Sequence, residues 1–424
     1  MVATFAYVQE ISEKNPLRAE IQLGNKVLVA PFYGSIIRSN IDAECLRDLA
    51  STGILKNTQV ICYNMGDAEK FKEILQRSIF EFTGQQLSFK PFSDFVLTID
   101  PVGEYWQYNV ASEVEKLLAI SDLPDAVKAI LSAKDTQRTK LLKELMNDEA
   151  RIAGVVEWYL KKSIGYGSKT AIAPCLPIKG QATLKYALTT NRLAITTQEA
   201  NEWQKTAYYL IDFAAFNDIG VLDSIINQIY SLTPNIIIFK IYNSKFYEGD
   251  SVTQRNNLNE FLQKLAVYRQ TNKALTFGLN VDALGYHYLA QGLCGFIEPI
   301  SGNFNPDIRL RRKTVDLEEE KTRSYLGRYP HPLKLVECDE EVMKSLAQNT
   351  GAPLPCHCTE CSKYSSFPNN KDIYNRMRRK HRVLVRDQFV DELNAAAING
   401  TLRASMFDRL SESSKLNLFK TVYE

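Results

Sequence analysis

Short apolar runs recur along this chain, and stretches with helical periodicity separate several of them. The runs are rich in Val, Ile, Phe and Tyr and do not alternate strictly with polar residues, which is typical of strands buried on both faces of a parallel sheet. Eight strands are predicted, at Lys26–Tyr33, Gln59–Tyr63, Phe95–Asp100, Thr170–Cys175, Tyr208–Phe213, Asn235–Ile241, Ala274–Leu279 and Leu293–Pro299. Helices are predicted between the later strands, at Asp218–Leu232, Asn256–Tyr268 and Asp282–Gln291.

This alternation predicts an α/β fold, and specifically a (β/α)8 TIM barrel over residues 1–305, with a doubly wound open sheet as the alternative. The connection after the third strand is unusually long. We interpret residues 101–169 as a helical insertion, which is either a lid or substrate-gripping arm over the barrel or a solvated helical excursion. Residues 306–424 are predicted to form a C-terminal subdomain that contains an amphipathic helix at Val383–Asn399.

The C-terminal part contains a tight group of cysteines, Cys356-His357-Cys358-Thr359-Glu360-Cys361, with His381 downstream. Three thiolates and one imidazole make the closed tetrahedral shell that suits Zn²⁺, and such a shell leaves no position for a reacting water. We therefore predict a structural zinc site. His357 stands between two proposed ligands, so its side chain should point away, which leaves His381 as the nitrogen ligand. The alternative is three free thiols.

Composition and charge narrow the class of protein. The net charge of +2 predicts no global attraction to polyanions, so any nucleic-acid binding depends on local patches. No apolar run approaches the ~18 residues of a membrane span, and the N-terminal residues do not resemble a secretion signal. The scattered cysteines fit buried apolar positions in a reducing compartment; they are Cys45, Cys62, Cys175, Cys294 and Cys338. We expect a cytoplasmic protein without a membrane partner.

Polar residues at strand ends are the candidates for chemistry, because barrel active sites lie at the carboxyl ends of the strands. Asp100 ends the third predicted strand, Asp212 ends the fifth, and Glu298 lies near the end of the eighth. Each carboxylate is a candidate nucleophile or general base, and Asn280, after the seventh strand, is a candidate substrate ligand. For each of them the alternative is a helix N-cap or a hydrogen bond at the barrel rim.

Aromatic and basic residues are candidates for nucleic-acid contacts. Tyr105 and Trp106 follow Asp100 and either stack on a base or pack within the insertion. Arg309–Lys313 and Arg376–Arg386 are basic segments that either bind phosphates or form solvated faces. Within the second segment, Arg378 and Arg379 are the residues that we expect to contact phosphates.

These residues resemble the tRNA-guanine transglycosylases and their DNA-modifying relatives. That family joins a (β/α)8 barrel to a C-terminal zinc subdomain with a Cys-x-Cys-x-x-Cys motif and a downstream His. The zinc ligands implied by this resemblance are Cys356, Cys358, Cys361 and His381. Ala19–Phe32 is similar to the hairpin that enters the family's first barrel strand, and Leu97–Asp100 with Gly103 resembles its Leu-Thr-Asp-Ser-Gly-Gly element.

The resemblance implies base exchange. A carboxylate attacks C1′ of a guanosine, guanine leaves, and a 7-deazaguanine base such as preQ0 takes its place. Asp100 matches the family's first aspartate, whereas the second would fall at Ile297 or, after a one-residue slip, at Glu298. The family's Gly-rich loops after the fifth and sixth strands are replaced by Leu210–Ala214 and Ile241–Ser244.

Those loops shape the base pocket of the tRNA enzymes, so their replacement favours a divergent member that acts on DNA. The same exchange on tRNA is the first alternative. A catalytically inactive paralogue that binds nucleic acid or a partner subunit is the second. The expected cofactor is a structural Zn²⁺, and whether the protein is a homodimer or works with partner subunits stays open.

Overall fold

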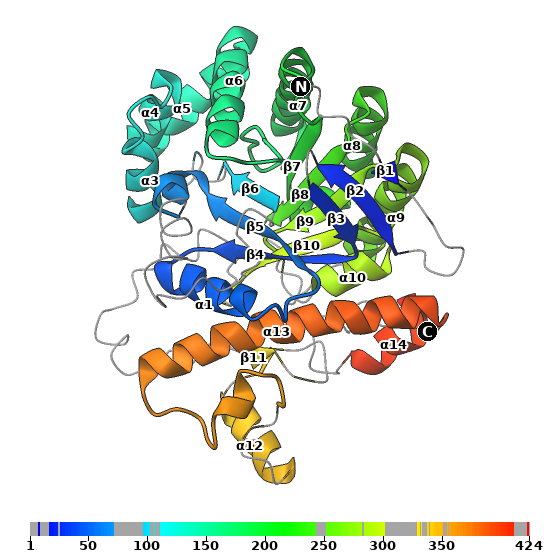
Figure 1. The fold of residues 1–424 in the computed structure, drawn as a ribbon. Coiled ribbons are helices and arrows are strands. Elements are labelled where there is room, and N and C mark those ends of the chain that lie inside the picture. The colour runs from blue at the N-terminus through cyan, green and yellow to red at the C-terminus, as the bar shows by residue number, and fades with distance from the viewer. Residues whose placement is uncertain are drawn as a thin grey trace.

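The computed structural model describes residues 7–8, 17–23, 26–71, 96–101, 106, 111–242, 252–281, 284–301, 329–330, 332, 337–338, 340–350, 354, 356–410 and 422–423. It shows an α/β fold built on a curled parallel sheet (Figure 1). The sheet has seven strands in the order β6-β5-β4-β10-β9-β8-β7. Their bounds are β4 Phe32–Ile37, β5 Thr58–Asn64, β6 Val96–Asp100, β7 Thr206–Asp212, β8 Ile236–Tyr242, β9 Leu275–Leu279 and β10 Gly295–Pro299.

Every neighbouring pair in this sheet is parallel. Seven of the predicted strands therefore contribute to it, and their side chains are almost all buried, as the continuous apolar runs indicated. The prediction of one strand at Lys26–Tyr33 was wrong. The chain there divides into β3 (Lys26–Ala30) and β4, and the break falls at Pro31, which has no N–H to continue a ladder.

The predicted fourth strand, Thr170–Cys175, does not form a ladder. Residues 170–178 lie between the two outer strands of the sheet and make one parallel bridge to each of them, Thr98 with Thr170 and Ile178 with Ile211. Between these bridges stand Pro174 and Pro177, which cannot donate ladder hydrogen bonds. The fully paired barrel that we predicted is therefore not observed; a buried irregular segment lies between β6 and β7.

Helices pack on the outside of the sheet, as expected for parallel strands joined by crossovers (Figure 1). They are α1 Asn40–Ser51, α7 Gln181–Ala200, α8 Ile219–Leu232, α9 Val252–Asn272 and α10 Leu284–Ala290. The short 3-10 helices with bounds in the described part of the chain are η1 Met65–Asp67, η4 Phe213–Asn217 and η6 Cys361–Lys363. The described part of the predicted insertion is helical, and its helices lie together at the upper left of Figure 1. They are α3 Ala111–Leu118, α4 Asp125–Ser132, α5 Asp135–Met146 and α6 Glu149–Gly165.

Two smaller parts complete the fold. An N-terminal antiparallel sheet consists of β1 Tyr7–Val8, β2 Ala19–Leu23 and β3. The C-terminal part consists of β11 Tyr329–Pro330, β12 Glu337–Cys338, α12 Glu340–Thr350, α13 Lys371–Ile398 and α14 Leu402–Arg409. The predicted domain boundary at residues 305 and 306 lies outside the described residues.

The long helix α13 fastens the C-terminal part to the sheet. In Figure 1 it runs across the lower side of the molecule, beneath β4 and beside α1. The Asp387 carboxylate accepts hydrogen bonds from the backbone N–H groups of Lys56, Asn57 and Thr58, just before and at the start of β5. Because three donors converge on one buried carboxylate, α13 is held in a fixed register against the sheet. Among the described residues, no helix has both the length and the apolar character needed to cross a bilayer.

Candidate functional site

Four side chains of the C-terminal part converge as predicted. Cys356 and Cys358 come from the loop after α12, Cys361 begins η6, and His381 projects from α13. The three Sγ atoms and one imidazole nitrogen all lie within 4.8 Å of one another. His381 Nδ1 is 3.3 Å from Cys361 Sγ and 3.6 Å from Cys358 Sγ. This Cys3His cluster can hold a metal ion and is compatible with a zinc site.

The surroundings of the cluster prepare it for a metal. His381 Nε2 lies 3.0 Å from the Pro330 carbonyl oxygen, which has no proton, so Nε2–H is the donor and Nδ1 keeps its lone pair for a metal. The backbone N–H groups of Cys358 and Cys361 point at the Sγ atoms of Cys356 and Cys358. Such N–H donors stabilise thiolate charge. His357 is exposed and is not one of the clustered residues, as expected.

A second group of polar residues lies where the sheet strands end. Asp100, the last residue of β6, and Lys240, in β8, form an ion pair with 2.8 Å between Oδ2 and Nζ, and each side chain is 5% exposed. β6 stands at one end of the strand order, and β8 stands next to the other end. A direct contact between them requires the sheet to curl until both side chains meet on its concave face.

The orientation of the Lys240 side chain agrees with this arrangement. Its neighbour Phe239 packs against Phe261 of α9 and Tyr288 of α10, which cover the outer face. Since successive side chains of a strand point to opposite faces, Lys240 points to the inside. The sequence analysis did not select Lys240. The available signal was one lysine in an otherwise apolar run, Ile236–Ile241.

Two further polar pairs lie at the same ends of the strands. Asp212 ends β7, and its Oδ2 is 3.9 Å from Lys179 Nζ. Arg38 follows β4, and its Nη2 donates to Oδ1 of Asn280 after β9 at 2.9 Å. Asp212 also accepts a hydrogen bond from the Ala214 N–H and is the N-cap of η4. The helix N-cap role, which was the alternative to a catalytic role, is therefore observed. We refer to three pairs together as the rim cluster: Asp100 with Lys240, Asp212 with Lys179, and Asn280 with Arg38.

Cys62, in β5, lies under the rim cluster. Burial, followed by the charge of Asp100, raises the pKa of the Cys62 thiol, while Lys240 and Arg38 act weakly in the opposite sense. Cys62 is therefore a neutral thiol and is not an activated nucleophile. The carboxylates and cations of the rim cluster are the groups here that can take part in nucleophilic or acid–base chemistry.

Glu298 lies on the other side of the sheet. Its Oε1 accepts hydrogen bonds from Arg386 Nε of α13 at 2.8 Å and from the Tyr33 hydroxyl at 3.1 Å, and its side chain is 1% exposed. Phe296, two residues earlier on the same face, packs on Tyr286 of α10. Glu298 therefore faces the outer helices and not the concave face where Asp100 lies. Its predicted catalytic role does not fit this position, because α13 supplies a buried arginine that occupies the carboxylate.

Trp106, one of the two predicted base-stacking residues, is not exposed at the rim. Trp106 is completely buried, and its ring centroid lies 6.0 Å from that of Tyr159 in α6. Packing within the insertion, which was the alternative, is what the structure shows for Trp106. Tyr105 lies outside the described residues.

Of the predicted phosphate ligands of α13, Arg379 is paired within the protein and Arg378 is buried. Arg379 Nε donates to Oδ1 of the buried Asp42 at 2.7 Å, and Arg378 is buried. Beside this contact, Arg376 pairs with Glu44 and Lys380 pairs with Asp48. The physical reason is that α1 presents acidic side chains toward this part of α13. The basic segment thus joins two helices, and its geometry does not support the predicted phosphate contacts of Arg378 and Arg379.

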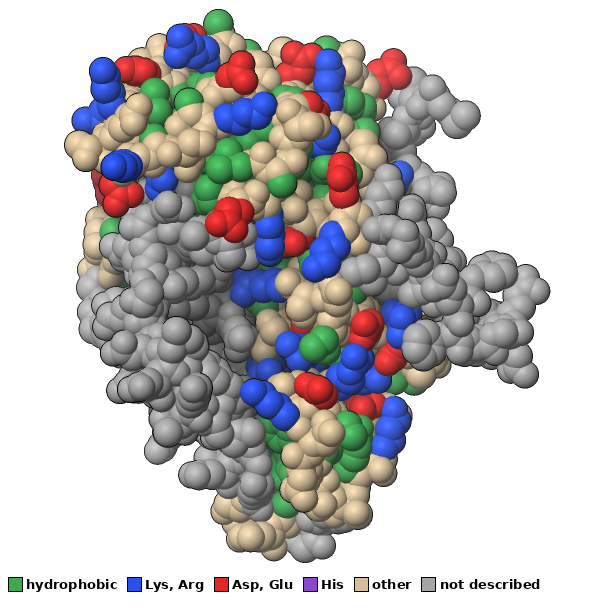
Figure 2. All heavy atoms as spheres, turned by 90° about the vertical axis from the view of Figure 1, so that its left-hand side faces the viewer, with side chains coloured by type: hydrophobic (Ala, Val, Ile, Leu, Met, Phe, Trp, Pro, Cys, Tyr) green, Lys and Arg blue, Asp and Glu red, His purple; other side chains and the backbone are tan. Residues whose placement is uncertain are grey.

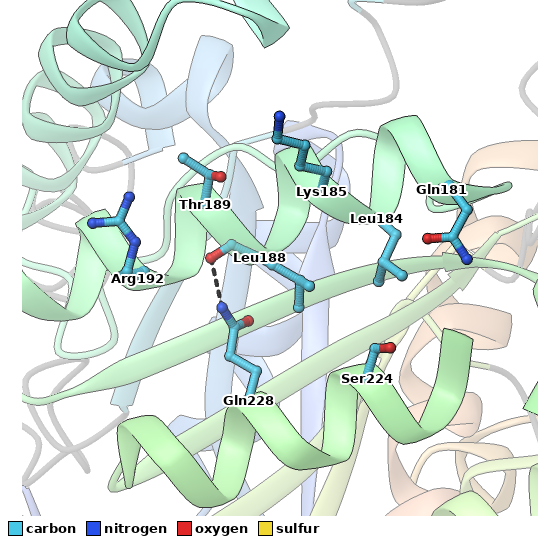
Figure 3. A pocket seen from close by; sticks show the side chains of 8 residues that line it. All are labelled: Gln181, Leu184, Lys185, Leu188, Thr189, Arg192, Ser224 and Gln228. Carbon is cyan, nitrogen blue, oxygen red and sulfur yellow. Dashed lines mark hydrogen bonds between the residues drawn. The ribbon is translucent and has the colours of Figure 1, made fainter. Parts of the chain in front are cut away.

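Figure 2 shows the face toward which β4, β5 and β6 point in Figure 1. In its described part, basic and acidic side chains are interspersed, without a large patch of one sign. A hollow of about 290 Å³ lies elsewhere, between α7 and α8 (Figure 3). Its lining includes Lys185, Arg192, Ser224 and Gln228, and Gln228 donates to the Leu188 carbonyl oxygen. Among the described residues, neither a carboxylate nor an imidazole lines this hollow.

No protein-family model matches this chain, and no curated protein matches it. The function must therefore be argued from the Cys3His cluster, the rim cluster and the motif resemblance described above.

Proposed function

We propose that this protein is a nucleic-acid guanine transglycosylase that replaces guanine in DNA with a 7-deazaguanine base such as preQ0. The observation that carries the proposal is the buried Asp100–Lys240 pair on the concave side of a curled parallel sheet, at the carboxyl ends of its strands. This is the position at which barrel enzymes place their reacting groups. We further propose that the sheet is a (β/α)8 barrel whose fourth strand, residues 170–178, has become irregular.

In this proposal Asp100 is the nucleophile. Its carboxylate attacks C1′, the bond from C1′ to the guanine nitrogen breaks, and an ester joins the sugar to Asp100. The departing guanine takes up a proton at that nitrogen. The incoming base then attacks C1′ through the corresponding ring nitrogen and loses its proton there, and the carboxylate of Asp100 leaves, so the exchange is balanced in protons. Burial of the Asp100 side chain supports this role, because exclusion of water protects the ester from hydrolysis.

Asp212 is proposed to hold the base. Leu210 is in register with Lys240, and Asp212, two residues further along β7, points to the same concave side. A carboxylate at this position accepts hydrogen bonds from the N1–H and amino groups that guanine and 7-deazaguanine bases share. Asn280 and Arg38 add an amide and a cation at the neighbouring strand ends.

Zinc is proposed as the ion of the Cys3His cluster, with a structural role. All four ligand positions would be filled by protein, and His381 lies on the same helix as Arg386 and Asp387, which anchor α13 to the sheet. The metal would order the end of the C-terminal part that carries Cys356, Cys358 and Cys361. It would take no part in the chemistry.

DNA is preferred to tRNA because the pocket loops of the tRNA enzymes are replaced, and η4 (Phe213–Asn217) now follows β7. A guanine within a duplex cannot reach a buried carboxylate, so the base must be flipped out, at a cost of roughly a few kcal/mol. Exchange on tRNA and an inactive nucleic-acid-binding role are the alternatives to be tested.

The test is release of radiolabelled guanine from plasmid DNA and from tRNA in parallel, with and without added preQ0. We expect release from DNA, loss of that release in Asp100→Asn, and a denaturation-resistant protein–DNA adduct in the parent protein. Asp122→Asn is a matched control, because Asp122 is an exposed carboxylate paired with Lys162 in the helical insertion. Release from tRNA alone would establish the tRNA alternative. Binding without any release would establish the inactive paralogue.

A further inference from the structure

Lys240 is a buried cation whose presence the fold does not require. Removing an ammonium group from water costs several kcal/mol, and a buried ion pair commonly contributes no more stability than an apolar pair of similar volume. The rest of β8 is apolar from Ile236 to Phe239. A leucine at position 240 opposite a leucine at position 100 would thus serve the core as well, which points to a chemical reason for the pair.

Several groups face the Asp100 carboxylate. Lys240 of β8 is in direct contact with it at 2.8 Å. Cys62 of β5 lies close by and is a neutral thiol, and Arg38 after β4 is a second cation in the same neighbourhood. Asn64 stands opposite Asp100 in the register of β5 and β6. Of these groups, Lys240 has the charge and the contact needed to govern the ionisation of Asp100.

Ionisation matters because a protonated carboxyl group is a poor nucleophile. A cation within hydrogen-bonding distance of a carboxyl group favours its charged form, which is the form that can attack. The contact also engages Oδ2 and so restricts rotation of the carboxylate, which fixes the direction that the carboxylate presents to an incoming sugar.

We propose that Lys240 is the positioning residue of the reaction: it keeps Asp100 ionised and oriented for attack, and it assists the departure of Asp100 from the sugar. This inference rests on the proposed function and deepens it. When the bond from Asp100 to C1′ forms, the carboxylate charge disappears and Lys240 is left facing a neutral ester. When the incoming base displaces the ester, the bonding electrons return to Asp100, and the restored carboxylate again faces the cation. Lys240 thus keeps the attacking carboxylate ionised and oriented, and it favours breakdown of the adduct by stabilising the carboxylate that leaves, while its own proton stays in place.

The experiment measures kcat/KM for guanine release from DNA between about pH 5 and 9 in the parent protein, Lys240→Met, Lys240→Gln and Lys240→Arg. Removing the cation should move the acid limb of the profile toward higher pH by about 1–3 pH units in the Met and Gln variants, because a nearby cation favours the charged form of a carboxyl group. Activity should then recover as the pH rises. Lys240→Arg keeps the charge and should keep the acid limb near that of the parent.

A second readout is the fraction of enzyme held as adduct during turnover, measured on denaturing gels. Above the shifted acid limb, the Met and Gln variants should accumulate more adduct than the parent, because no cation assists the leaving carboxylate. Lys205→Met is the matched control. Lys205 lies before β7, at the opposite end of the sheet strands, and pairs with Glu199, so its loss should change neither readout.

An acid limb that stays in place in the two neutral variants, or that moves equally in Lys240→Arg, would overturn the inference. If the neutral variants do not fold, as judged by thermal unfolding and zinc content, the Lys240→Arg variant still tests the inference. The acid limb of its pH profile must match that of the parent protein. If the parent protein itself releases no guanine from any nucleic acid, it is the proposed function that fails.

Discussion

The ion pair between Glu298 and Arg386 gives the sharpest test of which buried carboxylates act in the reaction and which stabilise the fold. We predict that Glu298→Gln lowers the free energy of unfolding and leaves the reaction intact in the molecules that stay folded. The structure supplies the reason. The pair is essentially unexposed, Arg386 Nε lies 2.8 Å from Oε1, and Arg382 Nη1 lies 3.9 Å from Oε2.

The magnitude follows from burial. Removing one member of a buried ion pair leaves the other charge without compensation, at a cost of about 3–5 kcal/mol. The free energy of unfolding should fall by about this amount in Glu298→Gln and also in Arg386→Met. The double variant buries neither charge, so its loss should be smaller than the sum of the single losses by about 2–3 kcal/mol.

The assay is urea unfolding of the zinc-loaded protein for the parent, both single variants and the double variant, followed by guanine release per folded molecule. A coupling free energy near zero would refute the structural account of the pair. A Glu298→Gln variant with parental stability and no guanine release would return Glu298 to the candidate catalytic residues and would place the reaction on the other face of the sheet.

Three further predictions concern stability. Cys358→Ser, or removal of zinc by a chelator, should lower thermal stability and expose the C-terminal part to limited proteolysis, because structural zinc contributes its binding free energy to folding. Burial lowers the pKa of His287 to about 3, and its ring nitrogens lie 2.7 Å from the Tyr423 hydroxyl and from Asn259 Oδ1. The unfolded chain takes up this proton below about pH 6.5 and the folded chain does not, so stability should fall by up to about 1.4 kcal/mol per pH unit from pH 6.5 toward 3. His287→Gln should remove that part of the pH dependence in urea titrations at about pH 7 and 5. Gly285→Ala should destabilise the protein by roughly 1–3 kcal/mol, measured by urea unfolding, because a Cβ there would lie 2.2 Å from the ring of Phe296.

Strands of the sheet were predictable because each is a local apolar run, and burial on both faces removes the need for alternation. The fourth strand shows where this argument stops. Thr170–Cys175 is apolar and buried like the others, yet Pro174 and Pro177 prevent a ladder. The apolar content of a run indicates that it is buried, whereas pairing in a β-ladder also requires backbone N–H donors. The two prolines carried that information in the sequence.

The zinc ligands were predictable for a similar reason, since three of them lie within six residues and the soft thiolate set is chemically specific. The partners of the carboxylates were not predictable. Lys240 contacts Asp100 across 140 residues of sequence, and Arg386 contacts Glu298 across 88. Whether a strand-end carboxylate faces the concave side or an outer helix depends on such distant contacts, which no local pattern encodes.

The strand order has a consequence for how the chain is made. β4 pairs on one side with β5, which follows it closely, but on the other side with β10, and its Tyr33 meets Glu298 across 265 residues. At a synthesis rate of about 5–20 residues per second, that edge of β4 waits roughly 15–50 s for its partner. During this time an apolar strand in the middle of the future sheet presents unpaired backbone groups to its surroundings. Biogenesis of this protein therefore depends on what shields the edge of β4 on the ribosome until the last strand emerges.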